Sequence, residues 1–515
     1  MSCRPSLEIT RRGALLAGLA TTLPVVAQPV RSPLQIVVPW EMKGLAPAVA
    51  GYMFTRLQIA ETLLDARDDG TPLPGLAERW SVSADGLVWR FGLRPRARFH
   101  DGTPVTAAAV VRCLHAARTP PSLLSQAPVA AVEADGIRTV VIRLEAPHGG
   151  LPALLAHSST LVLAPSSYAA DGHVRAIVGS GPYRITRLVP PQTVEASVFE
   201  GYDGPRPAVE QVRYLSVSRA ETRALMAEGG QADLVYGLDP AGLTRLRRHA
   251  TVPLVVATLP RTAILKLNCG LPALGDLRVR RALSLAIDRA GIARALLRDP
   301  ELAAGQLFAP SLAGWHDPAL APLAHDPAAA ARLLAEAGWT RGEGGLRDPS
   351  GQPLRLVMRT FVDRPELPVI ATALQEQFRQ AGIAVRVSIG NSGDVPLGHR
   401  DGSLQLALAA RNYASVPDPT GTLLQDFGPR GGDWGAMGWS SDRVVQALAE
   451  LSQGRAGPAR TAALRKQVAA TLQDELPVIP IAWYRQQVAV SPRVTGVGLD
   501  PLERSYRITA MGWAA

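Results

Sequence analysis

The chain has 515 residues, 47% of them hydrophobic and 19% charged, a balance that excludes wholesale disorder and predicts two or more domains. The formal net charge is +10, and almost all of the basic residues are arginines scattered among acidic neighbours. No nucleic-acid-binding motif accompanies this charge, so we expect a solvated basic surface and no nucleic-acid partner.

The N-terminal segment is typical of an export signal. Residues 1–27 combine a charged start with an apolar stretch, and they end at Ala27 in an A-x-A-like cleavage site. The apolar stretch is too short for a stable membrane span. The cleavage site has no cysteine, so we expect no lipid anchor. Arg11 and Arg12 resemble the start of a twin-arginine signal, with the general secretory route as the alternative. We therefore expect a periplasmic mature protein.

The first third of the mature chain predicts a strand, a helix and two hairpins. Leu34 to Pro39 is a short apolar strand, and a helix-like stretch follows it. Asp85-Gly86 forms a turn between two strand-like arms over residues 80–93. Thr106 is a helix N-cap residue, and a second hairpin turns at Asp135-Gly136.

The middle of the chain alternates helices and strands. Asp276 precedes a helix whose apolar positions continue at helical spacing to Ala290. Asp326-Pro327 opens another helix, and Gly338 stands where its left-handed C-terminal cap belongs. Strand-like and helix-like stretches then alternate through residues 354–389. This alternation predicts an α/β fold class, with sheets covered by helices.

After removal of the signal, the chain keeps the cysteines Cys113 and Cys269. An oxidising compartment would allow them to form a disulfide, but their spacing alone does not establish one. Each lies in or next to an apolar stretch, which favours two separate buried thiols.

The usual catalytic signatures are missing from the sequence. The nearest match to a nucleophile elbow is Gly179 to Tyr183, but Pro182 breaks the pattern, so we interpret Ser180 as part of a glycine turn. His100 follows a strand and precedes a capped helix, which favours a turn residue over a catalytic one. Since no histidine pair has metal-ligand spacing on one helix, we expect no resident metal, no cofactor and no enzymatic activity.

Several phrases, in a fixed order, resemble the family of oligopeptide-, dipeptide- and nickel-complex-binding proteins of ABC importers (solute-binding family 5). They are Leu73–Trp80, Phe99–Thr106, Gly179–Tyr183, Asn268 with Asp276–Arg289, Ala331–Trp339 and Leu476–Pro480. The resemblance covers essentially the whole mature chain. Further phrases are most similar to the nickel-complex or metallophore branch, namely Leu307–Ser311, Gly351–Arg355, Arg400–Gly402 and Pro417–Pro419.

The resemblance implies a two-lobed periplasmic-binding-protein (Venus-flytrap) fold, in which each lobe is a mixed β-sheet with flanking helices. Residues 28–262 would form lobe I, including an extra subdomain at about 60–178. Residues 263–485 would form lobe II, and residues 486–515 would return to lobe I. The ligand would lie in a cleft between the lobes, which closes by hinge motion.

The same resemblance predicts the residues that line the cleft. They are Met53 and Arg118 from the first lobe, Arg411, Asn412 and Tyr413 from the second, and Arg504 from the returning segment. A pair of arginines favours a carboxylated ligand, because guanidinium groups grip carboxylates bidentately. The thioether of Met53 suits contact with a metal chelate, although a methionine on a helix is also ordinary core filler.

The chain departs from the resembled proteins at several pocket positions. The nickel branch has an arginine near Ser158, a tryptophan near Ser122 and a histidine near residues 430–432, and this chain has none of them. Peptide binders hold the ligand's ammonium group with an aspartate in the region where this chain has Asn412 and Ala414 instead. These departures leave the choice between a peptide and a metal chelate open.

The sequence therefore predicts the periplasmic substrate-binding component of an ABC importer. Its ligand would be a peptide-like or carboxylate-rich small molecule, including a nickel or other metal chelate. Its partners would be permease and ATPase subunits at the inner membrane, and we expect a monomer. The alternatives are an exported hydrolase or other enzyme, which the missing nucleophile motifs disfavour, and a periplasmic chaperone or signalling receptor that has kept the fold.

Overall fold

The computed structural model describes residues 32–514 except residues 121, 249–251, 363 and 365. The export signal predicted for residues 1–27 lies outside these residues. By its internal contacts the chain divides after Ser32, and the elements below belong to the unit Pro33–Ala515.

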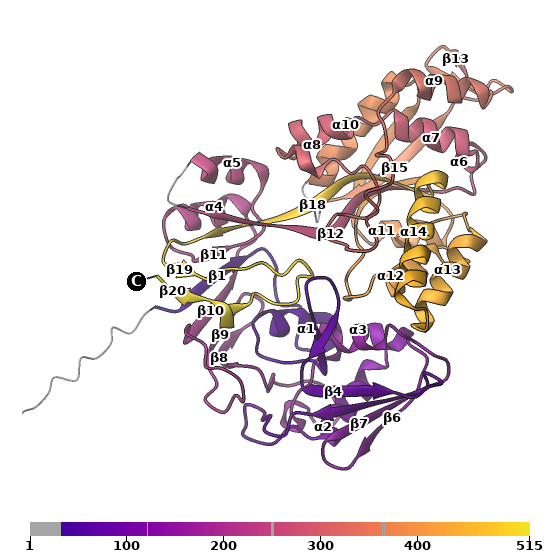
Figure 1. Cartoon of the computed structure of the whole chain (residues 1–515). Helices are drawn as coiled ribbons and strands as arrows, with labels where there is room; N and C mark the ends of the chain where they lie inside the picture. Colours follow the sequence, from indigo (N-terminus) through magenta and orange to yellow (C-terminus); the bar gives the residue numbers. More distant parts are fainter. Residues whose placement is uncertain (1–31, 121, 249–251, 363, 365, 515) are drawn as a thin grey trace, which may run out of the picture. The chain divides into compact units, whose positions relative to one another are not determined.

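Within the described residues, ten strands join into one mixed sheet in the order β16-β15-β17-β12-β18-β11-β1-β10-β9-β8 (Figure 1). Their bounds in chain order are β1 Leu34–Val38, β8 Tyr183–Val189, β9 Thr193–Val198, β10 Gln211–Ser216, β11 Leu234–Val235, β12 Leu254–Leu267, β15 Arg355–Phe361, β16 Ala384–Gly390, β17 Leu406–Asn412 and β18 Val478–Val490. Strand β1 is parallel to β10 and β11, and β15 is parallel to β16 and β17, as expected where helices connect the strands.

Strands β12 and β18 carry the sheet from one half of the unit to the other (Figure 1). They pair antiparallel from Leu254 with Ala489 to Lys266 with Val478. Strand β12 also pairs with β17, and β18 also pairs with β11, so these two strands belong to both halves. The register shifts at Pro260 of β12, because proline has no N–H to donate to the ladder.

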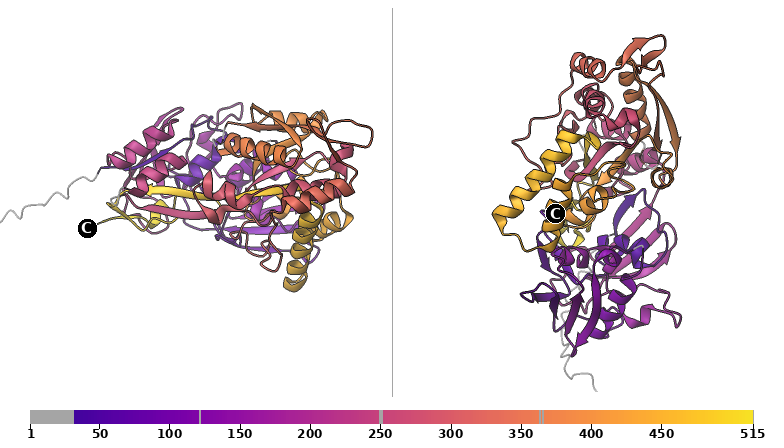
Figure 2. Two further views of the ribbon diagram at one scale, coloured as in Figure 1. Left: turned by 90° about the horizontal axis from the view of Figure 1, so that it is seen from above. Right: turned by 90° about the vertical axis from the view of Figure 1, so that its right-hand side faces the viewer.

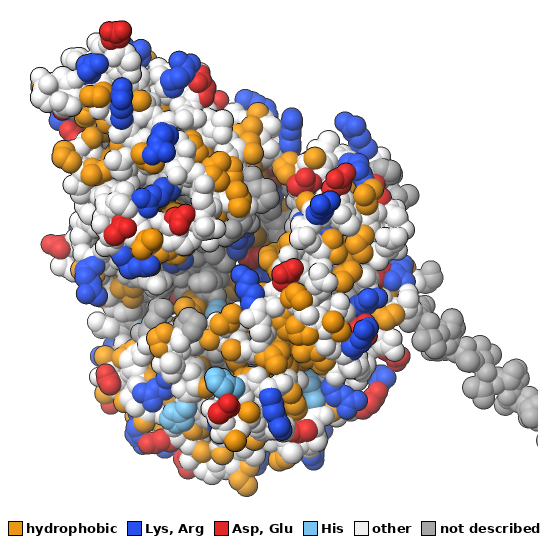
Figure 3. All heavy atoms as spheres, turned by 180° about the vertical axis from the view of Figure 1, so that it is seen from behind, with side chains coloured by type: hydrophobic (Ala, Val, Ile, Leu, Met, Phe, Trp, Pro, Cys, Tyr) orange, Lys and Arg blue, Asp and Glu red, His pale blue; other side chains and the backbone are white. Residues whose placement is uncertain are grey.

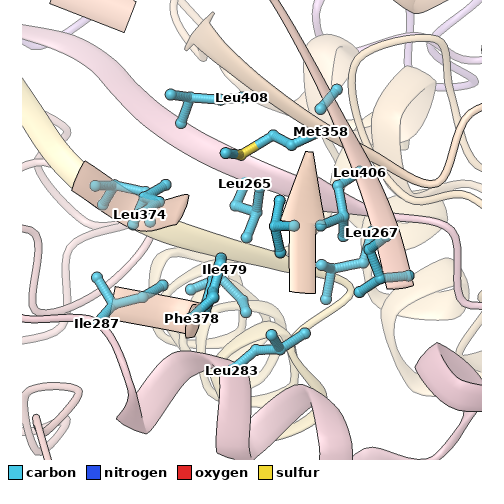
Figure 4. Packing of buried hydrophobic residues seen from close by; sticks show 14 of the residues in the cluster. Leu265, Leu267, Leu283, Ile287, Met358, Leu374, Phe378, Leu406, Leu408 and Ile479 are labelled. Atoms are coloured by element: carbon cyan, nitrogen blue, oxygen red, sulfur yellow. The ribbon is translucent and has the colours of Figure 1, made fainter. Parts of the chain in front are cut away.

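The half that contains β15, β16 and β17 has its core against one face of the sheet (Figure 4). Leu265 and Leu267 alternate with the buried Lys266 along β12, so period-two spacing places both leucines on the face that α7 (Leu277–Leu285) and α10 (Glu366–Gln380) cover. A neighbouring cluster packs α12 (Thr420–Phe427), α13 (Asp442–Gln453) and α14 (Pro458–Glu475) around Trp315.

The other half has two cores. The first joins β1, β10 and α1 (Pro47–Arg56) to the C-terminal residues 499–511. The second lies between α2 (Ala107–Ala117) and an antiparallel sheet in the order β4-β5-β7-β6. This sheet consists of β4 Ala77–Val82, β5 Val88–Leu93, β6 Val129–Asp135 and β7 Thr139–Leu144. Figure 2 shows it, in indigo and purple, at the end opposite to the orange α9–β13 region.

The remaining elements are short connections and surface helices. Their bounds are β2 Leu64–Ala66, β3 Pro72–Pro74, α3 Leu151–Leu155, α4 Ala220–Glu228, α5 Pro240–Arg248, α6 Pro272–Gly275, α8 Arg289–Ala295, α9 Pro327–Glu336, β13 Thr340–Gly342, β14 Gly345–Arg347, α11 Asp394–Arg400, β19 Val494–Thr495 and β20 Gly512–Trp513, with 3-10 turns η1 Leu123–Gln126, η2 Ser158–Thr160, η3 Pro165–Ser167, η4 Pro300–Leu302 and η5 Ile508–Ala510.

The local predictions about caps and hairpins are confirmed. Thr106 accepts a hydrogen bond from the backbone N–H of Ala109 at the start of α2. Asp326 does the same for α9, and Gly338 has a left-handed φ of +89° directly after that helix ends. The hairpins β4–β5 and β6–β7 enclose the two predicted Asp-Gly turns.

The predicted helix from Asp276 to Ala290 is wrong in its extent. Helix α7 ends at Leu285, and α8 begins at Arg289. Asp288 causes the break, because its carboxylate accepts the N–H of Gly291 at 2.7 Å and thereby caps a new helix.

Segment Gly179–Tyr183 needs its glycines because its backbone passes close to the backbone of residues 58–59. A Cβ added at Gly179 would lie 2.1 Å from the carbonyl oxygen of Ile59, and one at Gly181 would lie 2.2 Å from that of Gln58. His100 lies in a turn, as predicted, and its Nε2 is 2.9 Å from the carbonyl oxygen of Gly181. Burial lowers the pKa of His100 to about 4, so this contact is made by a neutral ring.

Cys113 and Cys269 are both buried free thiols. Among the described residues, no helix is long and apolar enough to cross a membrane. On the face shown in Figure 3, basic and acidic side chains are interspersed.

Candidate functional site

A cavity of about 400 Å³ lies where segments from both halves of the unit meet. Its wall combines seven of the residues between Tyr52 and Thr62 and residues 156–158 with Arg261 of β12, Asn412 at the end of β17, and residues 502–505 of the C-terminal segment. A second cavity of about 510 Å³ is lined largely by glycine, proline and other small residues, together with Asp68, Asp69, Asp418 and Arg465. We take the first cavity as the candidate site, because charged and polar side chains from distant segments converge on it.

Helix α1 contributes one face to this cavity. Tyr52, Thr55 and Arg56 follow each other at spacings of three and one, which places them on the same side of the helix, and all three line the cavity. Met53 and Phe54 do not line the cavity and are buried in the core with residues of β1. The helix therefore presents some of its side chains to the core and others to the cavity.

Glu503 joins Arg56 and Arg261 at the cavity wall. Its carboxylate accepts from Arg261 Nη2 at 2.6 Å and lies 3.8 Å from Arg56 Nη2, while its backbone carbonyl accepts from Arg56 Nε at 2.7 Å. Burial by itself would raise the pKa of Glu503, but Arg261, Arg56 and Arg364 outweigh burial and hold that pKa below its ordinary value. Glu503 is therefore an internal anion between cavity arginines.

Glu61 and Arg94 form a second ion pair on the wall. Arg94 Nη2 donates to both carboxylate oxygens of Glu61, at 3.0 and 3.1 Å, and lies 3.1 Å from the carboxylate of Asp203. Burial raises the pKa of Glu61 above its ordinary value despite the presence of Arg94. The two glutamates of the wall are thus shifted in opposite directions by their surroundings.

Arg504 completes the charge pattern by donating to Asp65 at 2.5 Å. Within the described residues, each arginine of the wall is therefore ion-paired to a carboxylate of the protein. The positive and negative side chains nearly balance, so the cavity offers hydrogen-bonding groups of both kinds instead of a net positive charge.

His157 lies on the same wall as the first residue before η2. Its Nδ1 accepts the backbone N–H of Ser159 at 3.1 Å and is 2.9 Å from the hydroxyl of Ser159. Ser122 donates to that hydroxyl at 3.0 Å. Burial lowers the pKa of His157 to about 4, so its ring is neutral near pH 7.

The structure places Asn412 and Arg504, among the predicted cleft residues, on the cavity wall. Met53 lies in the core. Arg118 lies at the end of α2 and donates to the carbonyl oxygen of Val129 at 2.7 Å, away from the cavity.

Arg411 and Tyr413 are directed away from the cavity by strand alternation. They flank Asn412 at the end of β17, so period-two geometry turns both to the opposite side. Arg411 forms a bidentate ion pair with the buried Asp426, at 2.6 and 2.9 Å. Tyr413 is fully buried, with its ring edge-on to Phe308.

Several wall residues had not been predicted from the sequence. Tyr52, Thr55 and Arg56 were within reach, because helical spacing places the three of them on one side of α1. Glu61 and Glu503 carry no local signal, since the arginines that hold them are distant in the chain. Ser158, where the nickel branch has an arginine, does line the cavity. Over the described residues, no group of three or more His, Cys, Asp or Glu side chains is placed to hold a metal ion.

Comparison with known proteins gives matches over most of the chain. A nickel-binding periplasmic protein of Escherichia coli (strain K12) is 27% identical over 471 residues, which cover 87% of this chain and 88% of the relative. The glutathione-binding protein GsiB of the same organism is 25% identical over 443 residues, which cover 83% of each chain.

The crystal structure of NikA from Brucella suis in complex with Fe(III)-EDTA superposes with a TM-score of 0.84 at 24% identity, covering 94% of this chain and 100% of that one. This likeness confirms the predicted two-lobed α/β fold. The profile of the bacterial extracellular solute-binding proteins, family 5, matches residues 71–434, more than half of the sequence. The chain therefore belongs to the family 5 bacterial extracellular solute-binding proteins.

Proposed function

We propose that this protein is the solute-binding component of an ABC importer and acts in the periplasm. The ligand is a peptide-like or carboxylate-rich small molecule, including a nickel or other metal chelate, and it binds in the cavity of about 400 Å³. The observation that carries the proposal is the convergence on this one cavity of paired charges from α1, β12 and the C-terminal segment, together with Asn412 of β17. The names of the relatives, a nickel-binding and a glutathione-binding protein, support the same range of ligands.

The size and the chemistry of the cavity suit such a ligand. Small-molecule sites in proteins have volumes of roughly 300–1,000 Å³ and carry a few placed polar groups. Glu61 and Asp65 offer acceptors for an ammonium group, while Asn412 and His157 offer donors for a carboxylate. A zwitterionic ligand finds partners for both of its ends in this arrangement.

The proposal keeps the division into lobes made from the sequence, and two of the hydrophobic cores support it. Lobe I is residues 28–262 with a subdomain at about 60–178, lobe II is residues 263–485, and residues 486–515 return to lobe I. Buried residues 63–164 form a core of their own, and residues 488–511 pack with β1 and α1. Strands β12 and β18 are then the two connections across which the lobes close on the ligand.

The remaining parts of the proposal concern export and partners. Residues 1–27 act as a twin-arginine-type signal that delivers the protein to the periplasm. The ligand-bound protein docks, as a monomer, on permease and ATPase subunits at the inner membrane. Closure is what the permease recognises, because only a ligand that contacts both lobes shifts the open–closed equilibrium.

Native mass spectrometry of protein purified from its own periplasm tests the binding function. We expect a retained small molecule, and we expect Ser158→Trp to abolish its retention, because Ser158 lies on the cavity wall and an indole there fills the space. Ser350→Trp, on an exposed turn, is the matched control and should retain the ligand.

A thermal-shift screen with dipeptides, glutathione, Ni²⁺–histidine and Fe(III)–EDTA then identifies the ligand class. Retention of the molecule by Ser158→Trp would place the site elsewhere. If the wild-type protein retains nothing and none of the compounds raises its melting temperature, the proposal is wrong.

A further inference from the structure

The orientation of the His157 ring is determined by the chain itself. The residue precedes η2 and caps it, because Nδ1 accepts the backbone N–H of Ser159 at 3.1 Å. A backbone N–H only donates, so Nδ1 must present its lone pair and carries no proton. The proton of the neutral ring therefore sits on Nε2.

Two buried hydroxyl groups reinforce this tautomer. The Ser122 hydroxyl donates to Ser159 Oγ at 3.0 Å, and the Ser159 hydroxyl is then free to donate to His157 Nδ1 at 2.9 Å. Ser122 and Ser159 are 1% and 4% exposed, so water does not compete for these contacts. The low pKa of His157, caused by burial, keeps the ring neutral near pH 7.

Ser159 occupies the Nδ1 edge of the ring, which leaves the Nε2 edge of this wall residue to face the cavity. His157 lines the wall next to Ser158, and none of the hydrogen bonds among the described residues uses its Nε2. Nε2–H is thus a donor of fixed position that is available to a ligand. By contrast, the guanidinium groups of Arg56, Arg94 and Arg261 are already engaged by carboxylates of the protein.

This tautomer is unsuited to metal coordination. A histidine that binds a metal through Nε2 donates its Nδ1–H to a carboxylate or a carbonyl oxygen. Here the partner of Nδ1 is the backbone N–H of Ser159, which can only donate a hydrogen bond. Moving the proton to Nδ1 would set two hydrogens against each other and would also remove the cap of η2.

We propose that His157 is a specificity-determining donor whose Nε2–H binds a carboxylate oxygen of the ligand, so that the cavity selects carboxylate-bearing ligands, including chelates whose metal is already saturated, over metal ions that need a protein histidine. This inference rests on the proposed function and names the ligand class within it. The cavity would then discriminate between ligands by a neutral, directional hydrogen-bond donor and not by its net charge.

Two substitutions at His157 test the proposal by isothermal titration calorimetry at pH 7. The side-chain amide of His157→Gln places an N–H donor near the position of Nε2, whereas His157→Ala provides none, and both variants lose the cap equally. The probes are glutathione, Fe(III)–EDTA and Ni²⁺ alone. For the carboxylate probes that bind the wild-type protein, we expect His157→Gln to retain affinity within about threefold and His157→Ala to lose about tenfold or more, since a hydrogen bond to a charged group is lost.

Equal losses in both variants together with binding of Ni²⁺ alone by the wild-type protein would identify His157 as a metal ligand and overturn the proposal. Unchanged affinity in His157→Ala would overturn it as well. Imidazole ¹⁵N resonances, assigned by their disappearance in His157→Gln, provide a readout that needs no ligand. A ring protonated on Nε2 supports the inference, and one protonated on Nδ1 contradicts it. If no probe binds the wild-type protein, the proposed ligand classes fail, while these resonances still decide the donor geometry.

Discussion

Glu503 illustrates how individual side chains set the electrostatics of the cavity. It lies between Arg56 and Arg261, whose side chains are only 14% and 12% exposed. A buried guanidinium without a counter-ion is strongly destabilising, so the internal carboxylate is needed by the fold itself. A carboxylate that entered the cavity would consequently meet arginines whose charge is already offset. Recognition then depends on the direction of the available donors and acceptors more than on net charge.

Glu503→Gln tests this assignment, because it keeps the shape of the side chain and removes its charge. We expect the free energy of unfolding near pH 7, measured by urea denaturation, to fall by about 3 kcal/mol, since two buried arginines lose their counter-ion. Glu200→Gln is the matched control. Its ion pair with Arg206 is exposed, so that substitution should change the free energy of unfolding by less than about 1 kcal/mol.

The difference in unfolding free energy between the wild type and Glu503→Gln should depend on pH with a definite sign. The pKa of Glu503 is lower in the folded state than its ordinary value, so its ionised form stabilises the fold above the unfolded pKa. That contribution is lost as the pH falls through the folded pKa. The difference between wild type and Glu503→Gln should therefore shrink below about pH 4. A difference that stays constant down to acid pH would contradict the ion-pair explanation.

Helix α1 and the short helix η2 form the element-scale support of the cavity. Tyr52, Thr55 and Arg56 of α1 and His157 and Ser158 at the start of η2 share one wall. The two elements touch at Gly51, where a Cβ would lie 2.2 Å from the carbonyl oxygen of Ser158. A glycine within this helix therefore has a packing reason that outweighs its poor helix propensity.

Gly51→Ala should destabilise the protein even though alanine favours helices. The helix-propensity gain is about 1 kcal/mol, and overpacking a close contact costs about 1–3 kcal/mol. Because a Cβ would lie so close to a backbone oxygen, we expect the upper end, a net loss of about 2 kcal/mol in the free energy of unfolding by urea denaturation. Gly421→Ala in α12 is the control, because its Cβ would meet nothing within 4 Å, and it should be neutral or stabilising. Equal effects of the two substitutions would show that the contact with Ser158 is unimportant.

At the scale of the whole unit, the two halves also touch each other away from the cavity. The N–H of Gly149, just before α3, donates to the carbonyl oxygen of Ser452 at 2.7 Å, and the two glycines Gly149 and Gly454 face each other. Arg455 donates to the carbonyl oxygen of Asp85 beside them. These contacts join the subdomain around β4–β7 to the α13–α14 turn, so they are present only when the halves are close.

Gly149→Leu should therefore weaken closure without altering the cavity wall. A Cβ there would lie 2.4 Å from Gly454 Cα, which forces the two segments apart. We expect a larger radius of gyration in small-angle X-ray scattering and about a tenfold lower affinity for the ligand retained by the wild-type protein, since the closed state carries the binding. Gly393→Leu, whose Cβ meets nothing within 4 Å, should behave like the wild type. An unchanged radius of gyration in Gly149→Leu would contradict this role.

The sequence by itself determined the local elements and the family. Thr106 and Asp326 cap their helices, and the Asp-Gly pairs turn their hairpins, because these structures depend on atoms only a few residues apart. The break at Asp288 was missed because the apolar spacing runs past it, whereas its cap depends on a side-chain rotamer. The ordered phrases were enough to indicate the two-lobed fold.

Only the tertiary structure decided which side chains line the candidate cavity. Asn412 lines the cavity, while its neighbours Arg411 and Tyr413 do not. Which side of β17 faces the cavity is defined only once β17 is paired with β12. Arg261 and Glu503 are 242 residues apart in the chain and meet at 2.6 Å. The cavity is built from such long-range pairs, and the sequence pattern around either partner contains no information about the other.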